Sequence, residues 1–102
     1  MPKFVHAVYF WLRDDLTPAE RQRFVAGIRS LREIESVERG YVGVPALTDR
    51  PVIERGYSYS LVVVFENEAA HDIYQRHPVH DRFRDECSGF WSSVRIFDSI
   101  DA

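Results

Sequence analysis

Four stretches of the chain have the residue pattern of β-strands, because they are rich in β-branched and aromatic residues and contain no proline. The clearest of them alternates along its length, with Leu61 and Val63 on one face and Val62 and Val64 on the other. Another contains two glycines, which indicate a bulge or a weak edge strand. The predicted strands are residues 4–13, 37–44, 57–66 and 90–100.

A segment between the first two predicted strands repeats apolar residues at helical spacing. At its start, Thr17 is a suitable N-cap, Pro18 suits the first helical position, and Glu20 completes a capping box with Thr17. The apolar stripe continues to Ile34, opposite a face with several arginines. The pattern therefore predicts an amphipathic helix over residues 18–34.

A second helix is expected after Asn67, whose side chain is a suitable N-cap. It must end near His77, because Pro78 disfavours helical geometry in the residue before it. A short helical turn over residues 79–86 is expected to follow, and Gly89 ends it. The break creates a helix end beside a proline, where side chains can point into a cavity instead of packing on a helical stripe.

The elements follow the order strand, helix, strand, strand, helix, strand. This is the order of the ferredoxin-like βαββαβ sandwich, an α+β fold with a four-stranded antiparallel sheet and both helices on one face. Both faces of the first predicted strand are largely apolar, yet the helices can cover only one. The other face, which includes Val5, Tyr9 and Trp11, is larger than the apolar patch that a soluble monomer usually exposes. We therefore expect a two-fold homodimer that forms through the open sheet face.

The composition is that of a folded globular domain. The 102 residues are 45% hydrophobic, 14% aromatic and 28% charged, and they have room for a single domain, residues 1–102. The net charge of −3 argues against nucleic acid as a partner. The single cysteine, Cys87, excludes an internal disulfide. Neither a membrane span nor a signal peptide is visible, so we expect a cytoplasmic protein without membrane contact.

Three of the four histidines lie between His71 and His80, around the predicted helix break, and the fourth, His6, is in the first strand. If that strand face points toward the helices, His6, Tyr74 and His80 are the catalytic candidates. Histidine suits acid–base catalysis near neutral pH, and a tyrosine hydroxyl can donate a hydrogen bond to a developing oxyanion. With His80 as base, Tyr74 as donor and His6 as orienting group, we expect proton abstraction beside a carbonyl, aldol-type ring closure included. Such a reaction needs no metal and no organic cofactor.

Each of these residues also has a structural interpretation. His80 can cap the short helix, and Tyr74 and His6 can be packed or hydrogen-bonded core residues. His71 is next to an aspartate in sequence and is expected to face solvent. His77 precedes a proline and is expected to fix the turn through backbone contacts.

A metal site is a further alternative with less support. His77 and His80 have the His-x-x-His spacing, and Asp81 or Asp85 could complete the site, but no other ligand motif accompanies them. Cys87 has no basic neighbour in sequence that would make its thiol a nucleophile. We therefore assign no metal ligands from the sequence.

Several segments of the chain resemble those of the Dabb family, the stress-responsive dimeric α/β-barrel proteins, and the resemblance covers nearly the whole chain. Its most specific part is the Tyr-x-x-His-Pro-x-His segment, spaced from an early strand histidine and from a late Phe-Asp. The segments are HAVYFWL at residues 6–12, GYSYSLVVVF at 56–65, YQRHPVH at 74–80 and IFD at 96–98.

The resemblance implies a ferredoxin-like protomer and a homodimer whose two sheets form a barrel. A plant member of the family closes a linear polyketide by aldol condensation. Its catalytic histidine and tyrosine align with His80 and Tyr74, and a further pocket histidine aligns with His6. Where that cyclase has another pocket histidine, this chain has Tyr59. The resemblance implies an apolar substrate pocket lined by Val8, Phe10, Phe24, Ile28, Tyr59, Leu61, Val63, Val94 and Ile96.

The residues leave two functions open. One is a cofactor-independent enzyme that acts on a small carbonyl or polyketide-like compound by His/Tyr acid–base chemistry. The other is a non-catalytic, stress-associated protein that binds a small apolar ligand in its cavity. A catalytic pair of His80 and Tyr74 should face a cavity, whereas a structural pair should be engaged in backbone hydrogen bonds.

Overall fold

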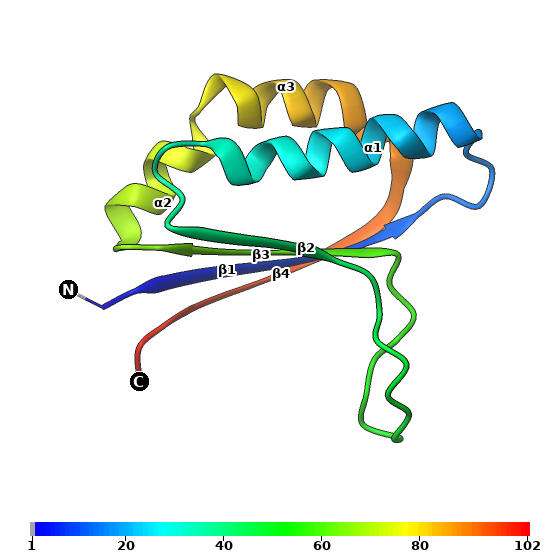
Figure 1. Cartoon of the computed structure of the whole chain (residues 1–102), viewed down its shortest axis with the longest axis horizontal. Helices are drawn as coiled ribbons and strands as arrows, with labels where there is room; N and C mark the ends of the chain where they lie inside the picture. Colours follow the sequence, from blue (N-terminus) through cyan, green and yellow to red (C-terminus); the bar gives the residue numbers. More distant parts are fainter. Residues whose placement is uncertain (1) are drawn as a thin grey trace.

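A four-stranded antiparallel sheet carries the helices on one of its faces (Figure 1). The computed structural model describes residues 2–102. The strand order β2-β3-β1-β4 is that of the ferredoxin-like fold, which confirms the topology predicted from the sequence pattern. The strands are β1 (Phe4–Leu12), β2 (Arg39–Gly43), β3 (Tyr59–Phe65) and β4 (Trp91–Ile100). The helices are α1 (Pro18–Ser30), α2 (Glu68–Gln75) and α3 (Pro78–Cys87), with short 3-10 turns η1 (Leu31–Glu33) and η2 (Ser88–Phe90).

Side chains identified from the sequence fix the starts of α1 and α2. The backbone N–H of Glu20 donates to the Thr17 hydroxyl at 3.1 Å, and the N–H of Thr17 donates to the Glu20 carboxylate at 2.8 Å. The capping box is therefore formed. Asn67 caps α2 by accepting a hydrogen bond from the N–H of Ala70 at 2.9 Å.

The helix after the break is longer than the sequence pattern predicted. The backbone N–H of Val79 donates to His77 Nδ1 at 3.1 Å, so His77 fixes the turn as expected and also caps α3. Pro78 then occupies the first helical position, where its missing N–H would have no helical partner. For this reason α3 begins one residue early and runs ten residues to Cys87, whereas α1 ends at Ser30 and continues as η1.

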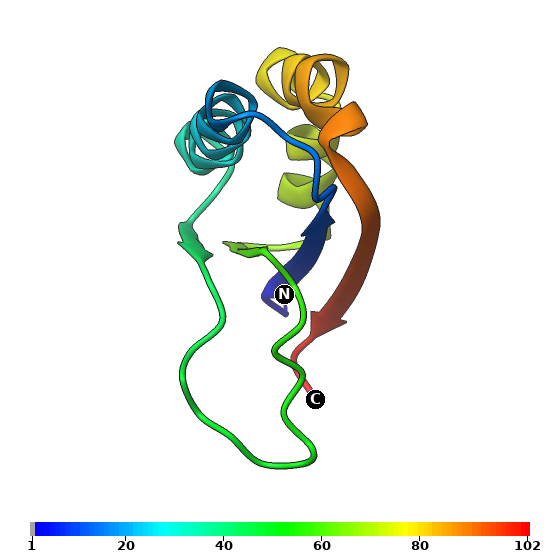
Figure 2. The ribbon, with the colours of Figure 1, turned by 90° about the vertical axis from the view of Figure 1, so that its right-hand side faces the viewer.

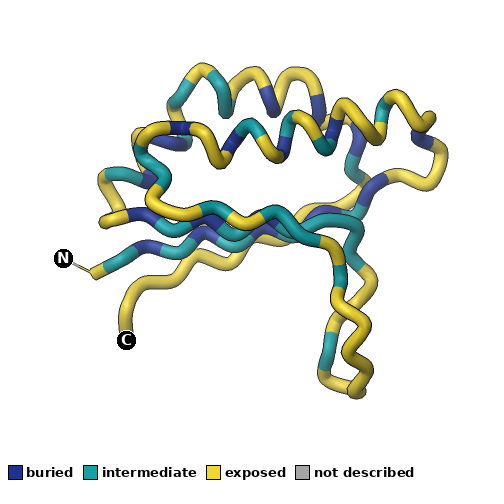
Figure 3. Tube along the Cα trace, in the orientation of Figure 1, coloured by how far each residue is buried: buried dark blue, intermediate teal, exposed yellow. Residues whose placement is uncertain are grey.

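The core lies between the sheet and the helices, as the buried segments in Figure 3 show. Along β1, buried residues alternate with half-buried ones, which confirms that one face packs against the helices and the other does not. β4 is an edge strand and is exposed from Ser92 to its end. Within residues 2–102, no helix is long and apolar enough to cross a membrane. The buried hydrophobic residues of the sheet are Phe4, Val8, Phe10, Leu12, Leu61, Val63 and Phe65.

Residues 44–58 connect β2 to β3 as an arm that projects from the sheet on the side opposite to the helices (Figure 2). Apolar side chains on this arm are largely in solvent: Leu47 is 95% exposed, and Val44 and Val52 are also exposed. Together with the half-buried outer face of β1, the arm leaves the open side of the sheet apolar and uncovered.

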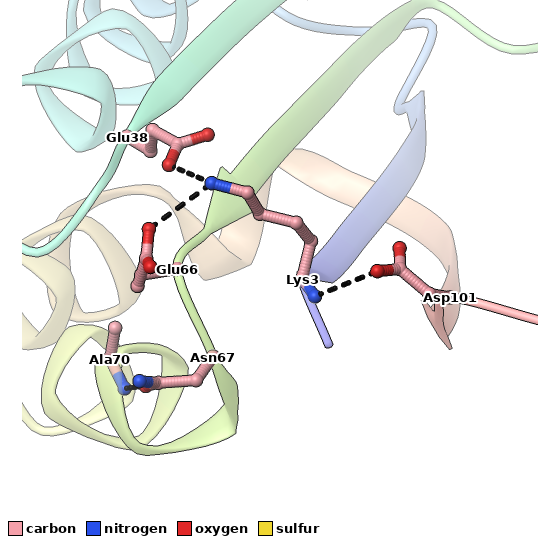
Figure 4. A network of polar contacts seen from close by, with 6 residues as sticks. All are labelled: Lys3, Glu38, Glu66, Asn67, Ala70 and Asp101. Atoms are coloured by element: carbon pink, nitrogen blue, oxygen red, sulfur yellow. Dashed lines mark hydrogen bonds and ion pairs between the residues drawn. The ribbon is translucent and has the colours of Figure 1, made fainter. Parts of the chain in front are cut away.

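The single lysine of the chain, Lys3, joins the ends of several strands (Figure 4). Lys3 Nζ forms ion pairs with Glu38 and with Glu66, the latter at 3.1 Å, and its backbone N–H donates to Asp101 at 3.3 Å. The hydrogen bonds that the Lys3 ammonium donates to Glu38 and Glu66 raise the pKa of Lys3, so the ammonium stays protonated. A protonated amine has no lone pair for attack on a carbonyl, and Lys3 is therefore unsuited to Schiff-base chemistry.

Candidate functional site

A cavity of about 270 Å³ lies between the sheet and the helices. His6 from β1, Tyr74 from α2 and His80 from α3 all line it, so the structure brings together the three residues that the sequence singled out. Most of the remaining lining is apolar, as in most small-molecule sites. The lining residues are His6, Val8, Phe10, Leu31, Leu61, Tyr74, Gln75, His80, Phe83, Arg84, Trp91, Val94 and Ile96.

The nine predicted pocket residues divide into three groups. Phe24, Ile28 and Val63 are fully buried in the core and do not line the cavity, because α1 packs directly on the sheet there. The ring of Phe24, for example, lies 5.2 Å from that of Phe10 in edge-to-face contact. Tyr59 lies in a shallow depression beside α1 instead. The predicted residues that do line the cavity are Val8, Phe10, Leu61, Val94 and Ile96.

His6 is paired with a carboxylate. It is 4% exposed, and its Nδ1 lies 2.5 Å from Oδ1 of Asp98, its direct partner across the β1–β4 register. An ionised carboxylate can only accept hydrogen bonds, so His6 Nδ1 carries the proton and donates it. In the neutral ring Nε2 is then the nitrogen with a free lone pair. An aspartate orients a catalytic histidine in the same way in serine hydrolases.

Tyr74 and His80 are neighbours on the cavity wall. Their ring centroids are 5.0 Å apart in edge-to-face contact, and the Tyr74 ring lies 5.9 Å from that of His6. Burial raises the pKa of Tyr74 far above its usual range, so the phenol keeps its proton. Burial, with the Arg84 charge second, lowers the pKa of His80 to about 4, and the imidazole is neutral at pH 7. Within residues 2–102, His80 Nδ1 is buried and has no hydrogen-bond partner.

His71 is buried, so the prediction that it faces solvent is wrong. It lies three residues before Tyr74 on α2, and residues at that spacing share a helix face, which here is the face toward the sheet. Its ring stacks on Phe4 with 4.3 Å between centroids, and the Gln75 amide donates to its Nε2 at 3.0 Å. Burial, followed by repulsion from the His6 ring, lowers the pKa of His71.

The histidines do not gather into the metal site that the His-x-x-His spacing suggested. His77 Nδ1 is engaged in the cap of α3, and its Nε2 lies 3.1 Å from the carboxylate of Glu35, far along the chain. In the described part of the chain, the group close enough to share a metal ion is a different one. It consists of His6, His71 and Asp98, whose ligand atoms all lie within 4.8 Å of one another.

Sequence reasoning missed three polar residues at this site. Asp98 belongs to the late Phe-Asp of the family motif, but only the strand register places it opposite His6. Gln75 and Arg84 line the cavity from α2 and α3. Arg84 follows His80 by four residues, and this spacing places both residues on one helix face. The spacing was therefore the signal from which Arg84 could have been predicted as a cavity residue.

A second hollow, of about 420 Å³, lies on the open side of the sheet. It contains no histidine and no carboxylate–imidazole pair, and it occupies the face on which dimerisation is expected. Its size therefore does not make it the better candidate for catalysis. The hollow is lined by Ala7, Tyr9, Trp11, Glu54, Tyr57, Arg95 and Phe97.

Solved structures from several organisms have the same fold. A Mesorhizobium loti protein described as a Dabb family protein with a ferredoxin-like fold is 23% identical, with a TM-score of 0.79 over 100% of this chain and 99% of that one. A dimeric ferredoxin-like protein of unknown function from Thermobifida fusca is 17% identical, with a TM-score of 0.78 over 98% and 92%. The hydroxynitrile lyase of Passiflora edulis is 16% identical, with a TM-score of 0.79 over 98% and 94%.

At these identities the similarity concerns the fold alone. No curated protein matches the chain. The family assignment comes from the sequence model of the stress responsive A/B barrel domain, Dabb, which matches residues 4–101. This match spans nearly the whole chain and agrees with the resemblance seen in its motifs, so the protein belongs to the Dabb family.

Proposed function

We propose that this protein is a cofactor-independent enzyme that removes a proton from the carbon beside a carbonyl group in a small apolar compound. The observation that carries the proposal is the convergence of His6, Tyr74 and His80, from three separate elements, on one apolar cavity. The unpaired Nδ1 of His80 favours this function over a purely structural role. The fold is compatible with catalysis, because the similar Passiflora edulis structure is that of an enzyme.

In this proposal His6 is the base. Asp98 holds the Nδ1 proton, so Nε2 can accept the substrate proton, and the carboxylate stabilises the imidazolium that results. His80 is the weaker base, because its pKa is about 4 and an efficient general base has a pKa near the working pH. This assignment exchanges the roles that the sequence pattern gave to His6 and His80, while the set of catalytic residues stays the same.

Tyr74 is the proposed hydrogen-bond donor to the substrate oxygen. Removal of the proton beside a carbonyl converts that carbonyl into an enolate whose oxygen carries negative charge. Because Tyr74 stays protonated, its O–H can donate to this oxygen, and the neighbouring His80 ring helps to hold the phenol. The enolate carbon then either takes the proton back from His6 or attacks a second carbonyl carbon, as in aldol ring closure, and in the second case the alkoxide oxygen that forms takes the proton from His6.

Arg84 favours a substrate that carries negative charge. It lines the cavity from α3, and within residues 2–102 its guanidinium forms no ion pair. Guanidinium groups bind carboxylates through paired, charge-assisted hydrogen bonds. The cavity is slightly smaller than the roughly 300–1,000 Å³ of typical ligand pockets. We therefore infer a small carbonyl compound with an apolar body and a carboxylate or similar anionic group.

The enzyme is further proposed to act as a homodimer joined through the open sheet face. The hollow on that face has three aromatic lining residues on β1 and β4, Tyr9, Trp11 and Phe97, and the arm places exposed apolar side chains on the same side. Several structures with this fold are described as dimeric. In this arrangement each catalytic cavity lies within one protomer, on the opposite side of the sheet from the interface.

A thermal-shift screen of wild type and His80→Ala tests the proposal. Small carbonyl compounds, with and without a carboxylate, are added at increasing concentration. A ligand at one hundred times its Kd stabilises the folded state by about 2.7 kcal/mol, which is readily visible in a domain of this size. We expect stabilisation of wild type that is lost in His80→Ala, with the dimer and the basal melting temperature largely retained.

The other outcomes are equally informative. Binding without any conversion of the bound compounds would support the non-catalytic ligand-binding function instead. A His80→Ala variant that aggregates or melts far below wild type would mark His80 as a structural residue. Absence of any shift across the screen would contradict a working pocket for carbonyl compounds.

A further inference from the structure

Two buried histidines and a carboxylate, each from a different element, lie close together, and His6 among them lines the cavity. His6 and His71 are 4% and 9% exposed, and their ring centroids lie 4.8 Å apart. One ligand atom from each ring and one from Asp98 all fall within 4.8 Å of one another. Two imidazoles and a carboxylate are a ligand set for zinc and related divalent transition metals, with a further position left open.

We propose that His6, His71 and Asp98 form a binding site for a divalent transition-metal ion, with Zn²⁺ as the representative case. The ion would take the place of the proton that His6 Nδ1 donates to Asp98. Ions such as Mg²⁺ and Ca²⁺ prefer sites built from oxygen ligands, so two nitrogen ligands favour the transition metals.

To accept the ion, ligand atoms that now lie up to 4.8 Å apart must draw together by at most about 1.5 Å, and the closest pair must separate. Zinc bonds of about 2.0–2.1 Å in tetrahedral geometry separate neighbouring ligand atoms by roughly 3.3 Å. The present 2.5 Å between His6 Nδ1 and Asp98 Oδ1 must therefore widen by less than about 1 Å. The Asp98 side chain is 42% exposed on an edge strand and can retreat by this distance. The half-buried Gln75, which donates to His71 Nε2, can turn away to free that nitrogen.

Metal binding would switch the tautomer of His6. While Nδ1 donates to Asp98, the neutral ring has no proton on Nε2. An ion bound at Nδ1 displaces the Nδ1 proton, and the neutral ring then carries its proton on Nε2. An Nε2 that carries a proton cannot accept another from a substrate. The ion and the proposed base function would therefore exclude each other. This consequence rests on the proposed function, whereas the binding of the ion does not.

Calorimetric titration of the untagged, metal-free protein with Zn²⁺ tests the site. We expect one ion per chain in wild type. His71→Phe keeps the aromatic stack on Phe4 and removes one ligand, so its affinity should fall at least tenfold. Asp98→Asn, at an exposed position, should give a comparable loss. The matched control is His77→Asn, which removes an imidazole elsewhere while keeping a side chain able to cap α3.

Wild-type protein that binds no Zn²⁺ at millimolar concentration would overturn the proposal, and so would His71→Phe or Asp98→Asn binding as tightly as wild type. A loss of binding in His77→Asn equal to that in His71→Phe would place the ion elsewhere and would also overturn it. The thermal shifts with carbonyl compounds are measured without metal. Absence of those shifts would therefore not affect the result of the zinc titration. Absence of zinc binding would likewise not affect the test with carbonyl compounds.

Discussion

The pairing of His6 with Asp98 determines which nitrogen of His6 can act as the base. A histidine on an apolar strand face is indistinguishable in the sequence from a packed core residue, and only the register of β4 supplies the carboxylate at 2.5 Å. The burial of His71 was likewise not predictable from its sequence neighbours. Its neighbour Asp72 suggested an exposed polar segment, but the face of α2 that points to the sheet carries His71 into the core.

The low pKa of His80 predicts a specific dependence of stability on pH. In the unfolded chain the ring takes up a proton below about pH 6.5, whereas in the folded protein it does so only near pH 4. Because the unfolded state binds more protons in this interval, the contribution of His80 makes folding less favourable as the pH falls from 6.5 to 4. We predict that the loss of unfolding free energy across this interval, measured by urea denaturation, is smaller in His80→Gln than in wild type.

Comparison with wild type at each pH removes the effect of the carboxylates, which also lose favourable contacts in acid. The two proteins should lose stability in parallel below pH 4, where His80 is protonated in both states. Parallel curves over the whole range from pH 7 to pH 4 would contradict a half-buried His80 that is neutral in the folded protein.

Arg84 is predicted to select ligands by charge. Arg84→Gln should weaken the binding of a carboxylate-bearing carbonyl compound by roughly tenfold to a hundredfold, the equivalent of about 1.5–3 kcal/mol for hydrogen bonds to a charged group. Binding of the matching amide should change little. Isothermal titration of both compounds measures the effect, with the exposed Arg82→Gln on the same helix as control. Equal losses for acid and amide would show that Arg84 does not contact the anionic group.

The helices illustrate how far local sequence determines local structure. The caps at Thr17 and Asn67 are properties of four adjacent residues, and each forms as predicted. The extent of α3 was underestimated, because the capping role of the His77 ring was not recognised from the sequence. Where α1 packs on the sheet, side-chain packing determines which of the predicted pocket residues line the cavity. Phe24 and Ile28 fill the space between α1 and the sheet, a result that residue spacing alone does not contain.

The capping box of α1 gives a prediction of stability. Thr17→Ala removes the acceptor for the N–H of Glu20 and should lower the free energy of unfolding by about 1 kcal/mol. Urea denaturation monitored by circular dichroism measures the change. Thr48→Ala, at an exposed position in the arm, is the control and should be neutral. A neutral Thr17→Ala would mean that the cap adds nothing to a helix already held by its packing.

The fold of the whole chain was easier to predict from the sequence than the site. Strand and helix order, the two-faced β1 and the family motifs all led to the same fold, because each depends on patterns spread over the whole chain. The site was less predictable, since its polar partners come from strands and helices far apart in sequence. His6 and Asp98, for example, are 92 residues apart.

The proposed dimer interface can be tested with a matched pair of charges. Phe97 on the open face and Ile73 on α2 are 54% and 55% exposed in the single chain. Phe97→Glu would bury a carboxylate in the interface and should raise the dimer dissociation constant at least tenfold. Ile73→Glu should leave it unchanged. Analytical ultracentrifugation over a concentration series measures both, and an unchanged dimer in Phe97→Glu would exclude that part of the face from the interface.

The most direct test of the account is hydrogen–deuterium exchange at the carbon beside the carbonyl of the compounds that bind. NMR in D₂O follows this exchange without knowledge of the final product. We predict exchange catalysed by wild type and slowed roughly 10²–10⁴-fold in Asp98→Asn and in Tyr74→Phe, with Asp101→Asn unaffected. Exchange no faster than in buffer, or equally fast in Asp98→Asn and wild type, would contradict the claim that this cavity abstracts a proton beside a carbonyl.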